Sequence, residues 1–364
     1  MSNSFVQYLY QHTQFNIEEF CNALSFDNVI ADLFISDKCN LKCRHCYFGN
    51  TSNVSASLSL DDWMRVVDKL YDIGIRHFHF SGKESSLCES SIDLMAYIKS
   101  FSQTYAGIVT NGLGETNYYK RLLQTGIDYL EFSVDGLKEN HDFIRGGNFF
   151  DKTFDCIKEL KDYTHKFNLT TCLNHCNFND YISLISTFYK LGITRFFATP
   201  FVIKGRAVNI ADISMTIGEY SLLLQEIFKF LQQMSNAKLQ IRCCIPTEYT
   251  YKSFESNDFF RQVLKDYIEK GKEPIFRING NVIQLSFQYI DIDYANTITI
   301  SNDGYIIPCA DDISNNDYYL HSLGNINNIN IETLKKLRKG IINNQLLNFL
   351  KNYGNTGDFR KTVG

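Results

Sequence analysis

Short apolar runs alternate with longer helix-periodic stretches from about residue 29 to residue 205. The short runs are rich in β-branched and aromatic residues, which favours strands. The predicted strands cover residues 28–36, 77–81, 106–111, 128–134, 169–174 and 194–201. The stretches between them predict helices, of which the first begins at Ser59 and the others cover residues 88–100, 116–125, 152–165 and 180–191.

The first predicted helix has the clearest boundary. Ser59 is followed three residues later by Asp62, an arrangement that resembles a capping box. One face of this helix would then carry Trp63, Val66, Val67, Leu70 and Ile73.

Six strand–helix units in succession favour a parallel sheet covered by helices, either an open doubly wound sheet or a partial barrel. In both architectures the chemistry lies at the carboxyl ends of the strands.

The pattern changes after the segment KGRAVNI at 204–210, and we place a boundary near residue 212. A helix at 216–235, a strand at 238–246 and a charged helical stretch to about 271 come next. Antiparallel strands are predicted over 274–310, with Asp303-Gly304 as a hairpin turn, and a last helix after 331. The predicted division is an N-terminal extension (1–28), a barrel (29–211), a helical connecting segment (212–273) and a small α+β C-terminal module (274–364).

Charge and hydropathy exclude some classes of partner. Forty acidic and thirty-six basic residues give a formal net charge of −4, which offers no broad electrostatic surface for nucleic acid or anionic membrane. The chain has no apolar stretch as long as a membrane span, and its first twenty residues lack the pattern of a secretion signal. We therefore expect a cytoplasmic protein.

The most specific chemical signal is a loop with three cysteines, Cys39, Cys43 and Cys46, in the spacing C-x3-C-x2-C directly after the first predicted strand. Iron–sulfur cubes are usually held by four cysteines. Three thiolates would leave one iron without a protein ligand and open for chemistry. A structural zinc site with a distant fourth ligand is an alternative, although zinc loops favour paired C-x2-C units. Coincidence is another, because the chain has eleven cysteines.

The cysteine loop, the repeated strand–helix units and several short motifs together resemble the radical S-adenosylmethionine (SAM) enzymes over about residues 29–210. The resemblance implies a partial (β/α)6 barrel of the TIM type. It also implies that the three cysteines hold a [4Fe–4S] cluster whose fourth iron binds the amino and carboxylate groups of SAM. Reductive cleavage of SAM would give a 5′-deoxyadenosyl radical.

Further motifs follow the predicted strands. In the resemblance His45 packs against adenine, and Tyr47 is the aromatic residue that often follows the third cysteine. Gly82, Lys83 and Glu84 stand where the family has Gly-Gly-Glu-Pro, with Lys83 and Ser85 as departures. Glycine permits close backbone approach, and a carboxylate can accept a hydrogen bond from the SAM ammonium.

The remaining cofactor contacts implied by the resemblance come from the third to fifth strand ends. They are Asn111 in TNG, Ser133 and Asp135 in SVDG, Arg145 in HDFIRGG as a carboxylate partner, and Asn174 and Asn177 in CLNHCN. For each residue ordinary turn chemistry is the structural alternative.

The C-terminal segment ITISNDGYIIPC with LGNI (298–326) is similar to the SPASM or twitch extension of peptide-modifying members. Cys309 would then ligate an auxiliary cluster, although the full set of seven cysteines is absent and a degenerate extension is the preferred interpretation. Cys243 and Cys244 are candidates for that cluster or for a thiol hydrogen donor to a peptide radical. The alternative is that they are small buried hydrophobes.

The predicted substrate is a ribosomally synthesised peptide that acquires a cyclophane, thioether or other carbon crosslink, or an epimerised residue. Partners would include a reductant such as flavodoxin or ferredoxin. Recognition of the leader peptide would fall either to a separate protein or to the C-terminal module. Maturation of a folded protein and action on a small metabolite remain alternatives. A zinc-bound interaction module is the alternative without catalysis.

Overall fold

The computed structural model describes residues 26, 29–48, 56–245, 258, 274–287, 297–307, 320, 322–337 and 339. The charged stretch before residue 271, Cys309 and nearly all of the N-terminal extension lie outside these residues.

The strands form one eleven-stranded sheet in the order β11-β10-β1-β2-β3-β4-β5-β6-β7-β9-β8. Neighbours are parallel from β10 to β9, and only the outermost strands, β11 and β8, pair antiparallel. The bounds are β1 Ile30–Leu33, β2 His77–Phe80, β3 Tyr105–Thr110, β4 Tyr129–Ser133, β5 Phe167–Leu173, β6 Arg195–Pro200, β7 Gln240–Ile245, β8 Ile275–Ile278, β9 Asn281–Phe287, β10 Thr297–Ile300 and β11 Ile306–Ile307.

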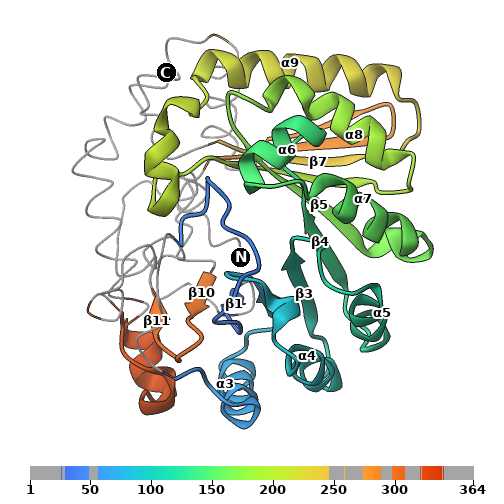
Figure 1. Ribbon diagram of the computed structural model, residues 1–364. Coiled ribbons are helices and arrows are strands. Elements are labelled where there is room, and N and C mark those ends of the chain that lie inside the picture. The colour runs from blue at the N-terminus through green and yellow to red at the C-terminus, as the bar shows by residue number, and fades with distance from the viewer. Residues whose placement is uncertain are drawn as a thin grey trace, which may run out of the picture.

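The sheet curves without closing, and the helices follow one another around its outside (Figure 1). The α-helices are α3 Leu60–Asp72, α4 Ser91–Ser100, α5 Thr116–Gln124, α6 Lys138–Arg145, α7 Phe150–Glu159, α8 Tyr181–Tyr189 and α9 Ile217–Gln233. Short 3₁₀ helices are η1 Ser85–Leu87, η2 Lys161–Lys166, η3 Phe178–Asp180, η4 Gly205–Ile213 and η6 Ile326–Asn328. The prediction of a partial (β/α)6 barrel is confirmed, and the open doubly wound sheet is excluded.

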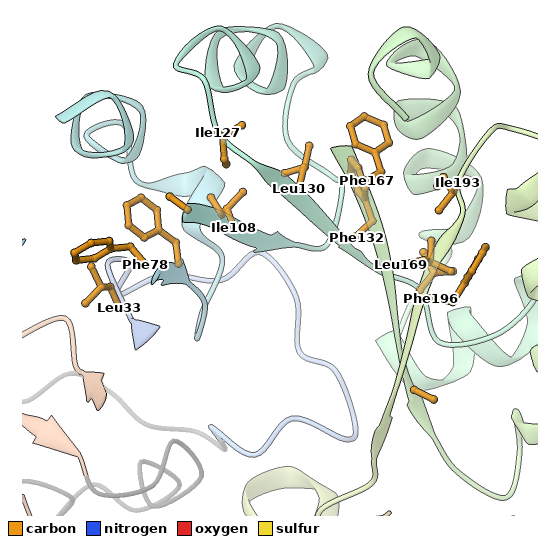
Figure 2. Packing of buried hydrophobic residues seen from close by; sticks show 14 of the residues in the cluster. Leu33, Phe78, Ile108, Ile127, Leu130, Phe132, Phe167, Leu169, Ile193 and Phe196 are labelled. Atoms are coloured by element: carbon orange, nitrogen blue, oxygen red, sulfur yellow. The ribbon is translucent and has the colours of Figure 1, made fainter. Parts of the chain in front are cut away.

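The core lies between the outer face of the strands and the helices. Figure 2 shows Leu33, Phe78, Ile108, Leu130 and Phe196 in this layer, and all five are fully buried. Because successive side chains of a strand point to opposite faces, their neighbours in sequence point into the barrel. Most of these inner positions are polar, and they include Asp32, His79, Glu131, Thr170 and Arg242.

Local signals account for most helix boundaries. The capping box at the start of α3 is present, because Ser59 accepts from the Asp62 amide and the Asp62 carboxylate accepts from the Ser59 amide. The single helix predicted over 152–165 is wrong in one respect, because α7 ends at Glu159 and the chain continues as η2. Helix α6 was not predicted, because its buried face consists of His141, Ile144 and Arg145 and lacks an apolar pattern.

The C-terminal strands extend the barrel sheet at both of its edges. The predicted hairpin turn at Asp303-Gly304 joins β10 to β11, and Gly304 has a φ of +87°. The LGNI motif packs on this turn, where Asn325 Nδ2 donates to the Asp303 carbonyl at 2.8 Å. Ile326 is fully buried, and Lys69 Nζ of α3 donates to its carbonyl at 2.7 Å. In the described residues this motif thus fastens the hairpin to the barrel.

Among the described residues, none of the helices is both long enough and apolar enough to cross a bilayer.

Candidate active site

The three-cysteine loop begins directly after β1, at the carboxyl edge of the sheet. Its cysteines are free thiols: Cys43 is buried, Cys46 is partly buried and Cys39 is exposed. Helix α6 covers the buried cysteine, because Arg145 Nη1 lies 3.8 Å from Cys43 Sγ. The loop therefore presents its thiols over the mouth of the barrel, where chemistry was expected.

Burial and neighbouring charges shift the pKa of the buried thiol, Cys43. Burial raises the pKa of Cys43 to about 11, Arg145 opposes this shift, and Cys46, Asp135 and Cys39 add to it. Cys43 would therefore be a neutral thiol near pH 7 and would lose its proton on binding metal, because thiolates are the ligands.

A single zinc ion and a four-iron cube set different distances between their thiolate ligands. Thiolates around one zinc ion lie about 3.8 Å apart, given a zinc–sulfur bond of about 2.3 Å. No group of three or more His, Cys, Asp or Glu side chains in the described part of the chain is arranged to hold one ion. In a four-iron cube each thiolate binds a different iron, so the ligands stand farther apart. Three thiols from one loop can each bind a different iron of such a cube.

Neighbouring strand ends hold the loop in place. The Glu84 amide donates to the Lys38 carbonyl at 2.9 Å, and Asn111 Nδ2 donates to Asn40 Oδ1 at 2.7 Å. The motif after β2 and the motif after β3 are thus both tied to the cysteine loop, as the sequence positions suggested.

The segment after β2 is shaped by Gly82 and Glu84. Gly82 has a φ of +89°, and a Cβ there would lie 2.7 Å from the Phe34 ring, so only glycine fits. The Glu84 carboxylate is buried and accepts from Thr110 Oγ1 at 2.7 Å and from the Asn111 amide at 2.9 Å. Glu84 therefore joins the ends of β2 and β3, whatever it binds in addition.

Lys83, the departure from the family pattern, points back toward the cysteine loop. Its Nζ donates to the Asp37 carbonyl at 2.9 Å. Burial lowers the pKa of Lys83, while Asp37, Cys39 and Cys46 raise it, which places the ammonium near two of the thiols.

A buried ion pair lies behind the loop. Arg145 Nε is 2.6 Å from Asp135 Oδ2, and His45 Nε2 is 3.6 Å from the same oxygen. Burial by itself would raise the pKa of Asp135, but Arg145 and His45 hold it below its ordinary value. Burial lowers the pKa of His45 to about 4, so the ring is neutral near pH 7 and can pack against a flat apolar surface.

His141 belongs to the same network and was missed as a site residue. Its Nδ1 accepts from the Asp135 amide at 3.2 Å, and its side chain is buried. His141 is the first residue of the HDFIRGG segment, the same motif that points to Arg145.

Asn174 and Asn177 form part of the turn after β5, and their role as cofactor contacts stays a prediction. Both are fully buried. Asn177 Oδ1 accepts from the Asn174 amide at 2.8 Å, and Asn177 Nδ2 donates to the Cys172 carbonyl at 2.8 Å. Asn174 Oδ1 accepts from the Cys176 amide at 3.0 Å. Turn formation, the structural alternative, accounts for these polar atoms. Ser133, by contrast, lies at an inner position of β4 and is partly exposed.

Cys243 and Cys244 point to opposite faces of β7. Cys243 is 1% exposed and belongs to the hydrophobic core, so it cannot meet a substrate radical in the barrel. This burial favours the alternative that Cys243 is a small buried hydrophobe. Cys244 lies at an inner position and is partly exposed. Cys309 falls outside the described residues.

Residues 33–188 match the model of the Radical SAM superfamily. These residues contain the cysteine loop, the motif after β2 and the Asp135–Arg145 pair. These residues therefore form a radical SAM domain. A radical SAM domain uses a [4Fe–4S] cluster and SAM as cofactors, and Cys39, Cys43 and Cys46 are the residues that would hold the cluster.

Two curated relatives cover this region. The chain is 27% identical over 185 residues to Fe-coproporphyrin III synthase of Methanosarcina barkeri, which covers 50% of this chain and 46% of that protein. It is 25% identical over 187 residues to the sporulation killing factor maturation protein SkfB of Bacillus subtilis, covering 51% and 45%. The chain thus matches about half the length of each of these two relatives.

The fold is similar to that of SuiB of Streptococcus suis bound to its precursor peptide SuiA. The TM-score is 0.61 at 17% identity, covering 82% of this chain and 63% of SuiB. This likeness extends beyond the residues that match the family model and concerns the fold alone.

Proposed function

We propose that this radical SAM enzyme acts on a ribosomally synthesised peptide, in which it installs a crosslink or an epimerised residue. The observation that carries the chemistry is the loop of three free thiols at the carboxyl edge of an open barrel. When bound, the cluster and SAM supply a 5′-deoxyadenosyl radical that removes a hydrogen atom from an unactivated carbon.

The chain's own residues then position the cofactor. Glu84 accepts a hydrogen bond from the SAM ammonium, because its carboxylate already lies beside the loop and keeps acceptor capacity. The neutral His45 ring packs against adenine. Ser133 and the backbone after β4 face the ribose or the SAM carboxylate, while the Asp135–Arg145 pair keeps this strand end in place.

Support for a peptide substrate comes from two sources. SkfB is a maturation protein of a killing factor, and SuiB is bound to a precursor peptide. The open barrel adds a physical reason, because an unclosed sheet admits an extended chain from the side while its polar inner face can bind amides.

Action on a small molecule is the second candidate. The identity of 27% to Fe-coproporphyrin III synthase favours it, since that relative is matched over the same half of the chain. A buried polar barrel interior can also accommodate a small polar substrate.

The test combines two measurements. Anaerobic reconstitution with iron and sulfide, followed by a reductant and SAM, should give an iron–sulfur absorption band and release 5′-deoxyadenosine. A colourless protein that holds one zinc ion per chain and does not cleave SAM would show that this protein has no radical SAM activity.

The substrate is tested by co-expression with short peptides encoded beside the gene, followed by mass spectrometry. A crosslink removes two hydrogen atoms, and an epimerisation in deuterated water adds one deuterium. The matched control is the enzyme with Cys39, Cys43 and Cys46 changed to Ala. Unmodified peptides together with turnover of a small metabolite would favour the second candidate.

A further inference from the structure

The segment that follows β6 touches the cysteine loop at its backbone. Gly205, the first residue of η4, has a φ of +58°, and a Cβ there would lie 2.3 Å from the Tyr47 carbonyl oxygen and 2.7 Å from that of Cys46. Such distances do not occur for real side chains, and the obstacle is backbone that cannot rotate away. Glycine is therefore required at this contact.

The next residue makes two hydrogen bonds to the same loop. The Arg206 amide donates to the Cys46 carbonyl at 3.0 Å, and Arg206 Nε donates to the Cys43 carbonyl at 2.8 Å. Two of the three cysteine residues are thus held through their carbonyl groups by one residue. A charged donor makes the stronger kind of hydrogen bond.

This contact bridges distant parts of the sheet. The cysteine loop follows β1 and Arg206 follows β6, and β2, β3, β4 and β5 separate these strands. On its other side the loop is held by α6, where the Arg44 amide donates to the Ile144 carbonyl at 2.8 Å and Arg145 lies against Cys43. The loop is therefore fixed between α6 and η4.

We propose that Gly205 and Arg206 are positioning residues for the iron–sulfur cluster, and we name them the cluster-loop latch. The latch fixes the backbone of Cys43 and Cys46 before metal binds, so that their thiols meet the cube without a further ordering step. This role depends on the cluster only and holds for any substrate.

A general role in folding is the competing explanation, and the structure separates the two. The latch segment has its own anchor, because Ala207 and Ile213 pack with Ile144 and Phe201 in a small apolar cluster. Removing the Arg206 side chain should therefore leave the segment folded and release only the cysteine loop.

The experiment compares Arg206→Met, Arg206→Lys and the wild-type protein. Methionine keeps most of the apolar stem and removes the side-chain donors, whereas lysine keeps the charge and one donor group. Lys42→Met is the matched control, because Lys42 is an exposed residue of the same loop that none of these contacts uses.

Two readouts are independent of turnover. In the metal-free protein, hydrogen exchange of the amides at 43–47 should rise about ten-fold in Arg206→Met, as expected for the loss of one strong hydrogen bond. In the reconstituted protein, release of iron to a chelator should accelerate by about the same factor. Arg206→Lys should lie between Arg206→Met and wild type, and Lys42→Met should match the wild type.

The proposal fails if Arg206→Met exchanges and releases iron like the wild type. It also fails if exchange rises equally in β4 and β5, since that pattern reports global destabilisation. If Arg206→Met does not yield folded protein, amide exchange and iron release are compared between Arg206→Lys and the wild type instead. Faster exchange confined to 43–47 in Arg206→Lys supports the latch, and unchanged exchange together with unchanged iron release overturns it.

Discussion

The Arg145 guanidinium lies 2.6 Å from the Asp135 carboxylate, and both side chains are buried behind the cysteine loop. One comes from the end of α6 and the other from the loop after β4. Because Arg145 also lies against Cys43, the pair connects the carboxyl edge of the sheet to the cysteine loop.

Breaking this pair on one side should be strongly destabilising. We expect Asp135→Asn to lower the free energy of unfolding by about 3–5 kcal/mol, because it leaves the Arg145 charge buried without a counter-charge. The double variant with Arg145→Met should recover part of the loss. Urea unfolding measures both, and Glu226→Gln, in an exposed pair with Lys229, is the control with an expected change below about 1 kcal/mol. Equal losses in Asp135→Asn and Glu226→Gln would contradict the prediction.

Replacing Cys39, Cys43 and Cys46 by Ala should abolish SAM cleavage, because no thiolate is left to hold the cluster. A second measurement is the iron content per chain after reconstitution, which counts the clusters. Near-zero iron in this variant means one cluster, whereas about four retained irons mean an auxiliary cluster elsewhere. Cys309→Ala should leave cleavage measurable, and its loss there would show that Cys309 serves the catalytic cluster.

Gly107 of β3 leaves space for the Tyr129 ring of β4. A Cβ at Gly107 would lie 2.1 Å from the Tyr129 ring, and that ring is held by two hydrogen bonds between its hydroxyl and the histidines of β2, one with His77 Nε2 at 2.9 Å and one with His79 Nδ1 at 2.6 Å. We expect Gly107→Ala to lower the free energy of unfolding by about 1–3 kcal/mol, as overpacking does.

The control for this prediction is the same substitution in α9. At Gly218 the nearest atom to an added Cβ is 3.8 Å away, so alanine fits. Gly218→Ala should be neutral or stabilise the protein by up to about 1 kcal/mol. Thermal unfolding of both variants checks the difference in sign.

Asp32, on the inner face of β1, should make stability depend on pH. Burial raises its pKa from 3.8 to about 7, the hydrogen bond from Ser81 opposes this shift and Glu131 adds to it. Between about pH 4 and pH 7 the unfolded chain has lost this proton while the folded chain keeps it. The contribution of Asp32 to stability therefore falls as pH rises through this window and stays constant above it.

Asp32→Asn removes that titration and isolates its effect from other groups. The difference in unfolding free energy between Asp32→Asn and wild type should shift in favour of the variant by a few kcal/mol from pH 4 to pH 7. Urea unfolding at several pH values measures it. A difference that stays constant across the window would show that Asp32 titrates near its ordinary pKa.

Local patterns in the sequence sufficed for the order of elements. The capping box at Ser59, the alternation of strands and helices, and the Asp303-Gly304 turn all depend on neighbours within a few residues, and each is present. Helix α6 escaped prediction because its buried face includes His141 and Arg145, and burial of polar groups depends on a partner elsewhere in the chain.

The sequence by itself determined the spacing of the three cysteines, the strand–helix alternation and hence the place of the site at the carboxyl edge of the sheet. Only the tertiary structure decided that Asp135 pairs with Arg145, that Cys243 lies in the core while Cys244 points inward, and that Arg206 binds the cysteine loop. The physical reason is that backbone geometry fixes local elements, whereas contacts between distant residues depend on strand register and on how the sheet curves.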